Sequence, residues 1–360
     1  MTNLLQSVAP VFEVDGQTKG ELALDLLALE VEENTEGLKK LALTLTDLGA
    51  PDGAQEERSR YLDGQILDFG KKLKVSIGPA DNARTIFDGL ISAIEAQFQE
   101  GTPPHVAIFA EDKLMSLRMT RRIKTYENVT DADIAQQIAQ QHGLAAEVDA
   151  QGPTYKVVQQ WNQSDLAFLR DRARLLQAEI WFSEEKLYFQ TRDKRSAPEV
   201  TLVQGNDLIQ LRVRADLAHQ RTKIAVSGFD AQSKEKIHEE AEGSAIQAEV
   251  AGGRTGVDIL QQAFGERVSY RVREVPLVSA EATAWARAEM LRRARAFVAL
   301  TGTTRGTPDL VVGSKVTLER CGAPFDGAGY YTTLVRHRYD LTNGYRTYFE
   351  AERPTIQGAS

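Results

Sequence analysis

Residues 309–353 read DLVVGSKVTLERCGAPFDGAGYYTTLVRHRYDLTNGYRTYFEAER, and their pattern decides the fold. Val316 and Leu318 alternate with polar residues within 315–320, and the runs 330–341 and 345–352 on either side of a turn predict two long strands. Alternation with a period of two predicts strands that bury one face and expose the other. Glycine and proline between 322 and 329 predict a turn. The C-terminal stretch therefore predicts a β-rich protein.

Asn343 and Gly344 separate the last two of these strands. An Asn-Gly pair favours a two-residue hairpin loop, because both central residues of a type I′ turn need positive φ. Such a loop places Tyr339 opposite Tyr348, and cross-strand pairs of this kind stabilise a register by about 0.2–1 kcal/mol each. The pattern thus predicts a long hairpin that closes a sheet.

Alternating runs also occur in the first hundred residues and after residue 200. Turn residues such as Asp15-Gly16 separate them. The strands expected from this pattern are 41–46, 73–77, 208–214 and 223–229. Short strands with regular turns predict closed or sandwiched antiparallel sheets.

Two helices are expected in the middle of the chain. Thr130 and Asp133 have the spacing of a capping box, and Gly143 provides a stop. Ser164 begins a second apolar stripe at helical spacing. Two short strands, 179–182 and 186–190, follow. This block predicts a small α+β domain.

A more polar segment lies between 230 and 300. Residues 230–256 are rich in Glu, Lys, Ala and Gly, and we expect a loop or mobile insertion there. Ser279 is the expected N-cap of a helix that runs to about Leu300. Arginines at 287, 292, 293 and 295 are expected to pair with acidic neighbours or a partner subunit.

Composition limits the function classes. The chain has 360 residues and a formal net charge of -8. General nucleic-acid binding is not expected, because a surface that binds phosphate backbones needs a basic excess. A single cysteine excludes an intrachain disulfide and fits synthesis and folding in the cytoplasm. No run approaches the ~18 apolar residues that span a bilayer, and no signal peptide is expected.

No motif predicts a catalytic, cofactor or metal site. The five histidines are widely separated and lack metal-ligand spacing. Cys321 has no local signature of a nucleophile and is expected to be a structural thiol. Residues 252–256 lack the Gly-Lys-Ser/Thr ending of a phosphate loop, so we expect a flexible loop.

Aromatic residues and one histidine have simpler interpretations. Trp161, Trp181 and Trp285 are scattered along the sequence and are expected to anchor apolar cores. His337 is expected on a strand, facing a partner or solvent. The absence of any aromatic cluster in the sequence does not favour sugar binding.

Three blocks of the chain contain motifs that resemble those of one known protein family. They are 86–89 with 103–104 and 126–134, then 161–169, and finally 306–316 with 329–331, 335–337 and 344–347. Together they resemble phage late control protein D, a family that includes hub proteins of contractile tails and the hub portion of VgrG spike proteins. The motif positions are Gly89, Asn128, Ser164, Asp165, Phe168, Pro308, Gly313, Tyr330, His337, Asn343, Gly344 and Tyr345.

The resemblance implies a mainly β fold with two tube-like antiparallel β-barrels, a small α+β domain and a helical insertion. The expected boundaries are 1–121 for the first barrel, 122–200 for the α+β domain, 201–355 for the second barrel with an insertion at about 230–300, and 356–360 for a short tail. It also implies a homotrimer, in which six barrels match a sixfold tube.

The implied function is a structural hub of a contractile tail or injection-system baseplate. Its expected partners are itself, the inner tube or a tube-initiator protein, a separate spike protein and other baseplate proteins. It would be part of a virion or injection particle. The alternatives are a tail-associated cell-wall hydrolase, which needs an acidic or Cys/His site, and a carbohydrate-binding tail module, which needs exposed aromatics.

Overall fold

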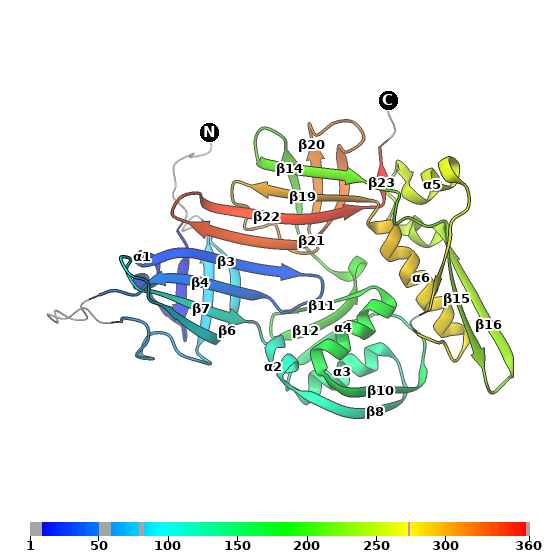
Figure 1. Cartoon of the computed structure of the whole chain (residues 1–360), viewed down its shortest axis with the longest axis horizontal. Helices are drawn as coiled ribbons and strands as arrows, with labels where there is room; N and C mark the ends of the chain where they lie inside the picture. The colour runs from blue at the N-terminus through cyan, green and yellow to red at the C-terminus, as the bar shows by residue number, and fades with distance from the viewer. Residues whose placement is uncertain (1–8, 50–58, 79–82, 273, 358–360) are drawn as a thin grey trace.

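The computed structural model describes residues 9–49, 59–78, 83–272 and 274–357. Within these ranges, one 13-stranded sheet has the order β14-β19-β22-β21-β3-β4-β7-β6-β5-β1-β2, with β20 beside β21 and β13 beside β20 (Figure 1). All neighbouring strands of this sheet are antiparallel to each other except the parallel pair β13 and β20. The predicted mainly β fold is confirmed.

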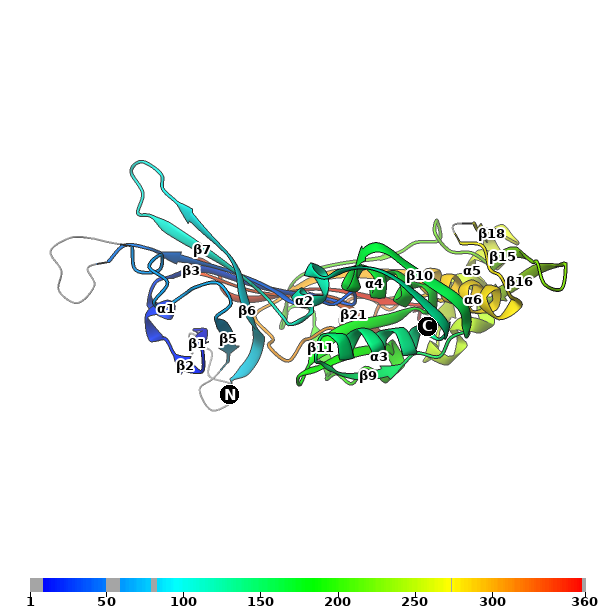
Figure 2. The same cartoon turned by 90° about the horizontal axis from the view of Figure 1, so that it is seen from below.

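The first strand group contains β1 to β7. Its strands are β1 Val11–Val14, β2 Gln17–Thr18, β3 Leu26–Asn34, β4 Lys40–Thr46, β5 Lys72–Ile77, β6 Arg84–Gln97 and β7 His105–Glu111, with helix α1 Gly20–Leu24 beside them. Leu41, Leu43 and Leu45 of β4 are buried, as their alternation predicts. The outer parts of β6 and β7 form a hairpin that projects from the body (Figure 2).

The second strand group contains β13 and β14 with β19 to β22. Their bounds are β13 Glu199–Val203, β14 Leu208–Ala215, β19 Val298–Thr304, β20 Lys315–Glu319, β21 Gly327–Asp340 and β22 Gly344–Arg353. It buries a separate apolar core around Phe349, Tyr330 and Leu300. Both strand groups therefore have their own core while sharing one sheet.

The predicted register of the β21–β22 hairpin is wrong. Tyr339 pairs with Tyr345 rather than with Tyr348, because the loop has three residues and Asp340 pairs with Gly344. The Asp340 carboxylate accepts the backbone N–H of Asn343 at 2.7 Å, and Gly344 has a φ of 64°. A three-residue loop followed by a left-handed glycine is the next most favourable hairpin after the two-residue type.

The middle of the chain forms the α+β unit. Its elements are α2 Leu114–Met119, β8 Arg121–Val129, α3 Asp131–Gln141, β9 Ala145–Asp149, β10 Tyr155–Ser164, α4 Asp165–Leu176, β11 Ala178–Ser183, β12 Lys186–Thr191 and the 3-10 turn η2 Arg192–Lys194. The capping box is confirmed, since Thr130 Oγ1 accepts the N–H of Asp133 and the Asp133 carboxylate accepts the N–H of Thr130. Helix α4 begins after Ser164 as predicted.

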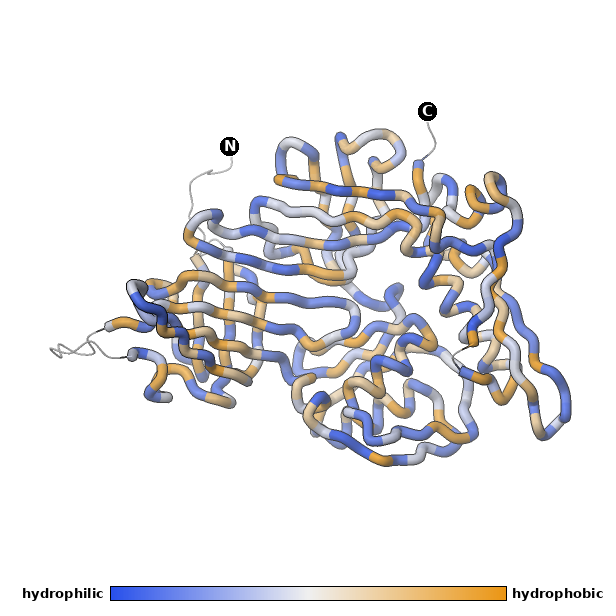
Figure 3. The backbone as a smooth tube through the Cα atoms, in the orientation of Figure 1, coloured by the Kyte–Doolittle hydropathy of each residue, from blue (hydrophilic) through white to orange (hydrophobic). Residues whose placement is uncertain are grey.

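The expectation of a loop over 230–256 is wrong. Strand β16 Glu235–Glu242 pairs with β15 Lys223–Asp230, and β18 Val268–Arg271 pairs with β15 on its other side. Ile237 is buried, while the ammonium of Lys223 lies 3.0 Å from the Glu240 carboxylate. Strand β16 is mostly hydrophilic, as its colours in Figure 3 show. Cross-strand ion pairs and one buried side chain stabilise it despite this composition. After the turn η3 Gly243–Glu249 come β17 Arg254–Thr255, α5 Gly256–Phe264 and, at the chain's end, β23 Thr355–Ile356.

Helix α6 differs from its predicted bounds at both ends. It spans Ser279–Arg295, and Val278 precedes it without a side-chain cap. The Ser279 hydroxyl instead donates to Glu239 of β16. Leu300 lies in β19, where it is buried. The helix therefore ends where the chain turns to join the large sheet.

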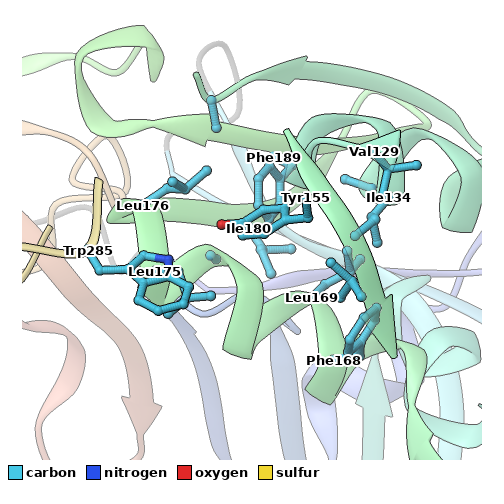
Figure 4. Packing of buried hydrophobic residues seen from close by; sticks show 14 of the residues in the cluster. Val129, Ile134, Tyr155, Phe168, Leu169, Leu175, Leu176, Ile180, Phe189 and Trp285 are labelled. Atoms are coloured by element: carbon cyan, nitrogen blue, oxygen red, sulfur yellow. The ribbon is translucent and has the colours of Figure 1, made fainter. Parts of the chain in front are cut away.

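The α+β unit and α6 share one apolar core. Trp285 and Met290 of α6 belong to the same buried cluster as Leu175 and Phe189 of the α+β unit. Figure 4 shows the Trp285 ring beside Leu175. The segment after residue 230 is therefore packed against the middle unit. No helix in the described ranges is long and apolar enough to cross a membrane.

Candidate functional site

The junction between the two strand groups is the most strongly built region. Strand β21 pairs with β3 from Leu334–Asn34 to Asp340–Ala28, although the two strands are about 300 residues apart in the chain. Arg336 forms an ion pair with Glu32 across this seam, and Arg338 Nε lies 2.6 Å from Glu30. The β21–β3 junction is therefore held by backbone hydrogen bonds and by two cross-strand ion pairs.

A buried ion network joins this seam to the α+β unit. The guanidinium of Arg195 lies 2.5 Å from Glu33 of β3 and 3.3 Å from Glu179 of β11. The hydroxyl of Tyr331 in β21 donates to Glu179 at 2.7 Å. Burial opposes ionisation of Glu33, yet Lys39 and Arg195 lower the pKa of its carboxyl. Charge-assisted hydrogen bonds thus connect β3 and β21 of the large sheet to β11 of the α+β unit.

Arg192 extends the network towards β22. Its Nη2 lies 2.7 Å from Glu352, and its guanidinium stacks 4.2 Å from the centre of the Tyr331 ring. Burial, together with the charge of Glu179, raises the pKa of Tyr331. No local sequence pattern marks these residues, because their partners come from strands that are distant in the chain.

Asp165 is the polar centre of the α+β unit. Its carboxylate accepts hydrogen bonds from Arg122 Nε at 2.9 Å and Gln160 Nε2 at 2.8 Å, and lies 2.8 Å from His142 Nε2. The side chain is completely buried. A carboxylate with this many donors holds β8, β10 and α3 around the start of α4.

The neighbouring motif positions have structural roles. Ser164 Oγ accepts the N–H of Ala167 and caps α4. The Phe168 ring stacks on Tyr126 with centroids 5.7 Å apart. Asn128 has a φ of 51°, a conformation that asparagine tolerates, at the point where β8 turns into α3.

His337 is buried, and the expectation that it faces a partner or solvent is wrong. Its Nδ1 lies 2.8 Å from the Tyr345 hydroxyl and 3.3 Å from Thr347 Oγ1. Burial, with a smaller contribution from Lys39, lowers the pKa of His337 to about 3. Pro308 and His337 line the same small gap of about 20 Å³, which has room for a single water.

Two motif glycines lie where a side chain would collide. A Cβ on Gly89 would overlap the backbone carbonyl of Glu111. Gly313 has a φ of 92°, and a Cβ there would meet Arg195 of the ion network at 2.9 Å. Tyr330 is buried, and its hydroxyl donates to a backbone carbonyl 2.8 Å away. The motif residues therefore lie in several separately packed regions of the fold, and they do not line one common pocket.

The candidate chemical groups also have structural surroundings. Burial and the charge of Asp326 raise the pKa of the Cys321 thiol, which disfavours the reactive thiolate. Arg292 and Arg293 pair with Glu289, and Arg295 pairs with Glu249, as expected, whereas the exposed Arg287 forms no ion pair within the described residues. Among the described residues, no group of three or more His, Cys, Asp or Glu has the geometry of a metal site.

The tryptophans divide between core and surface. Trp181 and Trp285 are buried, as predicted. Trp161 is 70% exposed, so its assignment to a core is wrong. It pairs across β8 and β10 with Ile123, which is 79% exposed. The outer face of this two-stranded sheet therefore carries an apolar pair open to solvent.

A family model described as the Alg8 N-terminal domain matches residues 8–340. The chain belongs to the Alg8 N-terminal domain family. No curated protein matches its sequence. The match to the Alg8 N-terminal domain family covers the first strand group, the α+β unit, α6 and the second strand group except β22.

Solved structures share the fold of this Alg8 N-terminal domain family member. The 43 kDa tail protein of prophage MuSo2 from Shewanella oneidensis has a TM-score of 0.69 and 14% identity, over 97% of this chain and 99% of that one. A tail protein from Neisseria meningitidis MC58 has a TM-score of 0.66 and 12% identity, over 96% of each chain. The E. coli c3393 protein, a component of the type VI secretion system, has a TM-score of 0.53 and 14% identity, over 99% of this chain and 78% of that one. The fold is thus one found in phage tail and type VI secretion proteins.

Proposed function

We propose that the chain is the central hub of a contractile-tail or injection-system baseplate, where it acts as a homotrimer and has a structural role. Solved structures that share its fold include a prophage tail protein, a second tail protein and a type VI secretion component. The motifs that resemble late control protein D and VgrG hubs support the finer assignment. The hub would join an inner tube or tube-initiator protein to a spike protein and contact other baseplate proteins.

The pairing of β21 with β3 carries this proposal. It runs through seven residue pairs and places two strand groups, each with its own apolar core, in one sheet. Two linked groups in each of three subunits would give six similar units around a threefold axis. A ring of this kind could contact a sixfold tube on one side and a threefold spike on the other.

The junction network supports a role in which the parts must stay rigid. Arg195 joins β3 to β11 through Glu33 and Glu179, and Arg192 joins the same region to β22. These contacts fix the strand groups and the α+β unit relative to one another. A rigid relation between the parts is what a symmetry adaptor needs, because its two faces must keep their spacing.

Mass and shape together test the proposal. A trimer of the 39.8 kDa chain has a mass of about 119 kDa, which light scattering after gel filtration measures directly. Averaged electron-microscopy images should then show a threefold ring with six lobes on one edge. A chain that stays monomeric at high concentration, alone and with a tube protein, contradicts the proposal.

An assay for cell-wall hydrolysis distinguishes the structural hub from the main alternative, a tail-associated cell-wall hydrolase. We expect purified protein to release no soluble fragments from peptidoglycan, since the sequence carries no hydrolase motif and the described residues hold no cluster of three or more metal-binding side chains. Steady release of fragments, lost on substitution of buried carboxylates in the fold, would instead favour an enzyme attached to the same particle. Binding to tail partners is the complementary measurement, with the tube protein as the bait.

A further inference from the structure

Arginines surround a cavity of about 220 Å³ where the β3–β4 turn, the α+β unit and α6 meet. The charged residues in its lining are Arg170, Arg174, Arg192, Arg292, Arg295, Glu36 and Glu179. Four of the five arginines pair with a carboxylate, through Arg174–Glu36, Arg192–Glu352, Arg292–Glu289 and Arg295–Glu249. The fifth arginine in the lining is Arg170.

Arg170 has no carboxylate partner among the described residues. Its Nε and Nη2 donate to the carbonyl oxygens of Glu36 and Gly37, at 2.9 and 3.0 Å. Burial lowers the pKa of Arg170, while the nearby charge of Glu36 raises it and that of Arg174 lowers it. The guanidinium is therefore held in place by neutral acceptors.

Arg192 contributes a buried donor without an acceptor. Its Nε has no hydrogen-bond partner within the described part of the chain, and Oε1 of Glu179, 3.8 Å from this nitrogen, also lacks one. A buried N–H that stays unpaired destabilises the folded chain. Because Arg192 and Glu179 both line the cavity, a guest that accepts from Arg192 Nε and donates a hydroxyl hydrogen to Glu179 Oε1 would satisfy both.

The size and access of the cavity fit a small guest. A single water needs only about 10–15 Å³, much less than this cavity provides. The side chains of Arg174 and Glu36 at its edge are 56% and 50% exposed, so solvent reaches it. Arg292 and Arg295 are already paired with Glu289 and Glu249. Arg170, which has no carboxylate partner among the described residues, and Nε of Arg192 are therefore the lining groups that can still donate a hydrogen bond to a guest.

We propose that this cavity binds a small multivalent oxyanion of the phosphate or polycarboxylate class. The planar guanidinium fork matches the oxygens of both kinds of anion. A bound anion would pair with Arg170 of α4 and accept a hydrogen bond from Nε of Arg192 in η2. Hydrogen phosphate and citrate each also carry a hydroxyl that can donate to Glu179 Oε1. This binding site goes beyond the proposed hub role and does not depend on it.

Calorimetric titration of the full chain with inorganic phosphate and with citrate tests the site. Chloride keeps the ionic strength constant, so general screening is the same in every titration. We expect saturable binding of at least one anion at one site per chain. Binding of phosphate alone indicates a tetrahedral ligand, and binding of citrate alone indicates a polycarboxylate.

Matched arginine variants locate the binding. Arg170→Gln should weaken the affinity at least tenfold, and Arg170→Lys should weaken it less, because the charge stays while the fork is lost. Arg287→Gln is the control, since Arg287 is exposed on α6 and does not line the cavity. If Arg170→Gln fails to fold, Arg170→Lys carries the comparison. Absence of saturable binding, or equal losses in the Arg170 and Arg287 variants, overturns the proposal, while the trimer mass measured on the same samples tests the hub role separately.

Discussion

Nη2 of Arg195 lies 2.5 Å from Oε1 of Glu33, and Nη1 of the same guanidinium lies 3.3 Å from Oε2 of Glu179. The side chains of all three residues are largely buried. Burying charge is costly unless partners compensate for the lost water, and Arg195 contributes to both carboxylates, together with Lys39 at Glu33 and Tyr331 at Glu179. The first strand group and the α+β unit depend on the same cation.

Removing that cation should therefore be strongly destabilising. We expect Arg195→Met to lower the free energy of unfolding by about 3–5 kcal/mol, because Glu33 and Glu179 would stay buried without it. Chemical denaturation measures the loss. Arg338→Met is the matched control at an exposed pair with Glu30 and should cost less than about 1 kcal/mol. Equal losses in the two variants would contradict a special role of the buried network.

His337 should make stability depend on pH. Burial lowers its pKa to about 3 in the folded chain, while the unfolded value is about 6.5. Between these values the unfolded chain binds the extra proton, so stability is lost as the pH falls below about 6.5. From pH 7 to pH 5 the contribution is at most about 2 kcal/mol.

Denaturation of wild type and His337→Gln at both pH values isolates this contribution. Carboxylates that titrate in the same range are common to both proteins, so their effects cancel in the difference. We expect the drop from pH 7 to pH 5 to be smaller in the variant. A drop of the same size in both proteins would show that His337 does not stay neutral in the folded chain.

Gly89 should not tolerate a side chain. Gly89→Ala places a Cβ against the carbonyl oxygen of Glu111, a backbone atom that cannot rotate away. We expect a loss of about 1–3 kcal/mol from overpacking, measured by thermal or chemical unfolding. Gly20→Ala is the control, since a Cβ at Gly20 would have no neighbouring atom within 4 Å. The prediction is wrong if both alanines have the same effect.

The start of α4 should depend on the Ser164 hydroxyl. Ser164→Ala removes the acceptor of the Ala167 N–H and should cost about 0.5–2 kcal/mol. Ser164→Asn keeps an acceptor at the N-cap and should retain most of the stability. Unfolding curves of the two variants check this, and a serine-to-asparagine loss as large as the alanine loss would refute the capping role.

The sequence alone determined the local structure. Alternation placed Leu41, Leu43 and Leu45 on a buried face, and the Thr130–Asp133 spacing defined the start of α3. These features depend on residues within a few positions of one another, so sequence spacing is sufficient to predict them. The β16 strand was missed because its polar composition hides a pairing that depends on β15.

Only the tertiary structure decided how the parts are joined. The pairing of β21 with β3, and the contact of Arg195 with both Glu33 and Glu179, bring together segments far apart in the chain. The burial of His337 and the exposure of Trp161 likewise depend on which elements cover each strand face. Sequence periodicity gives a strand two faces, but the neighbouring elements determine which of them water reaches.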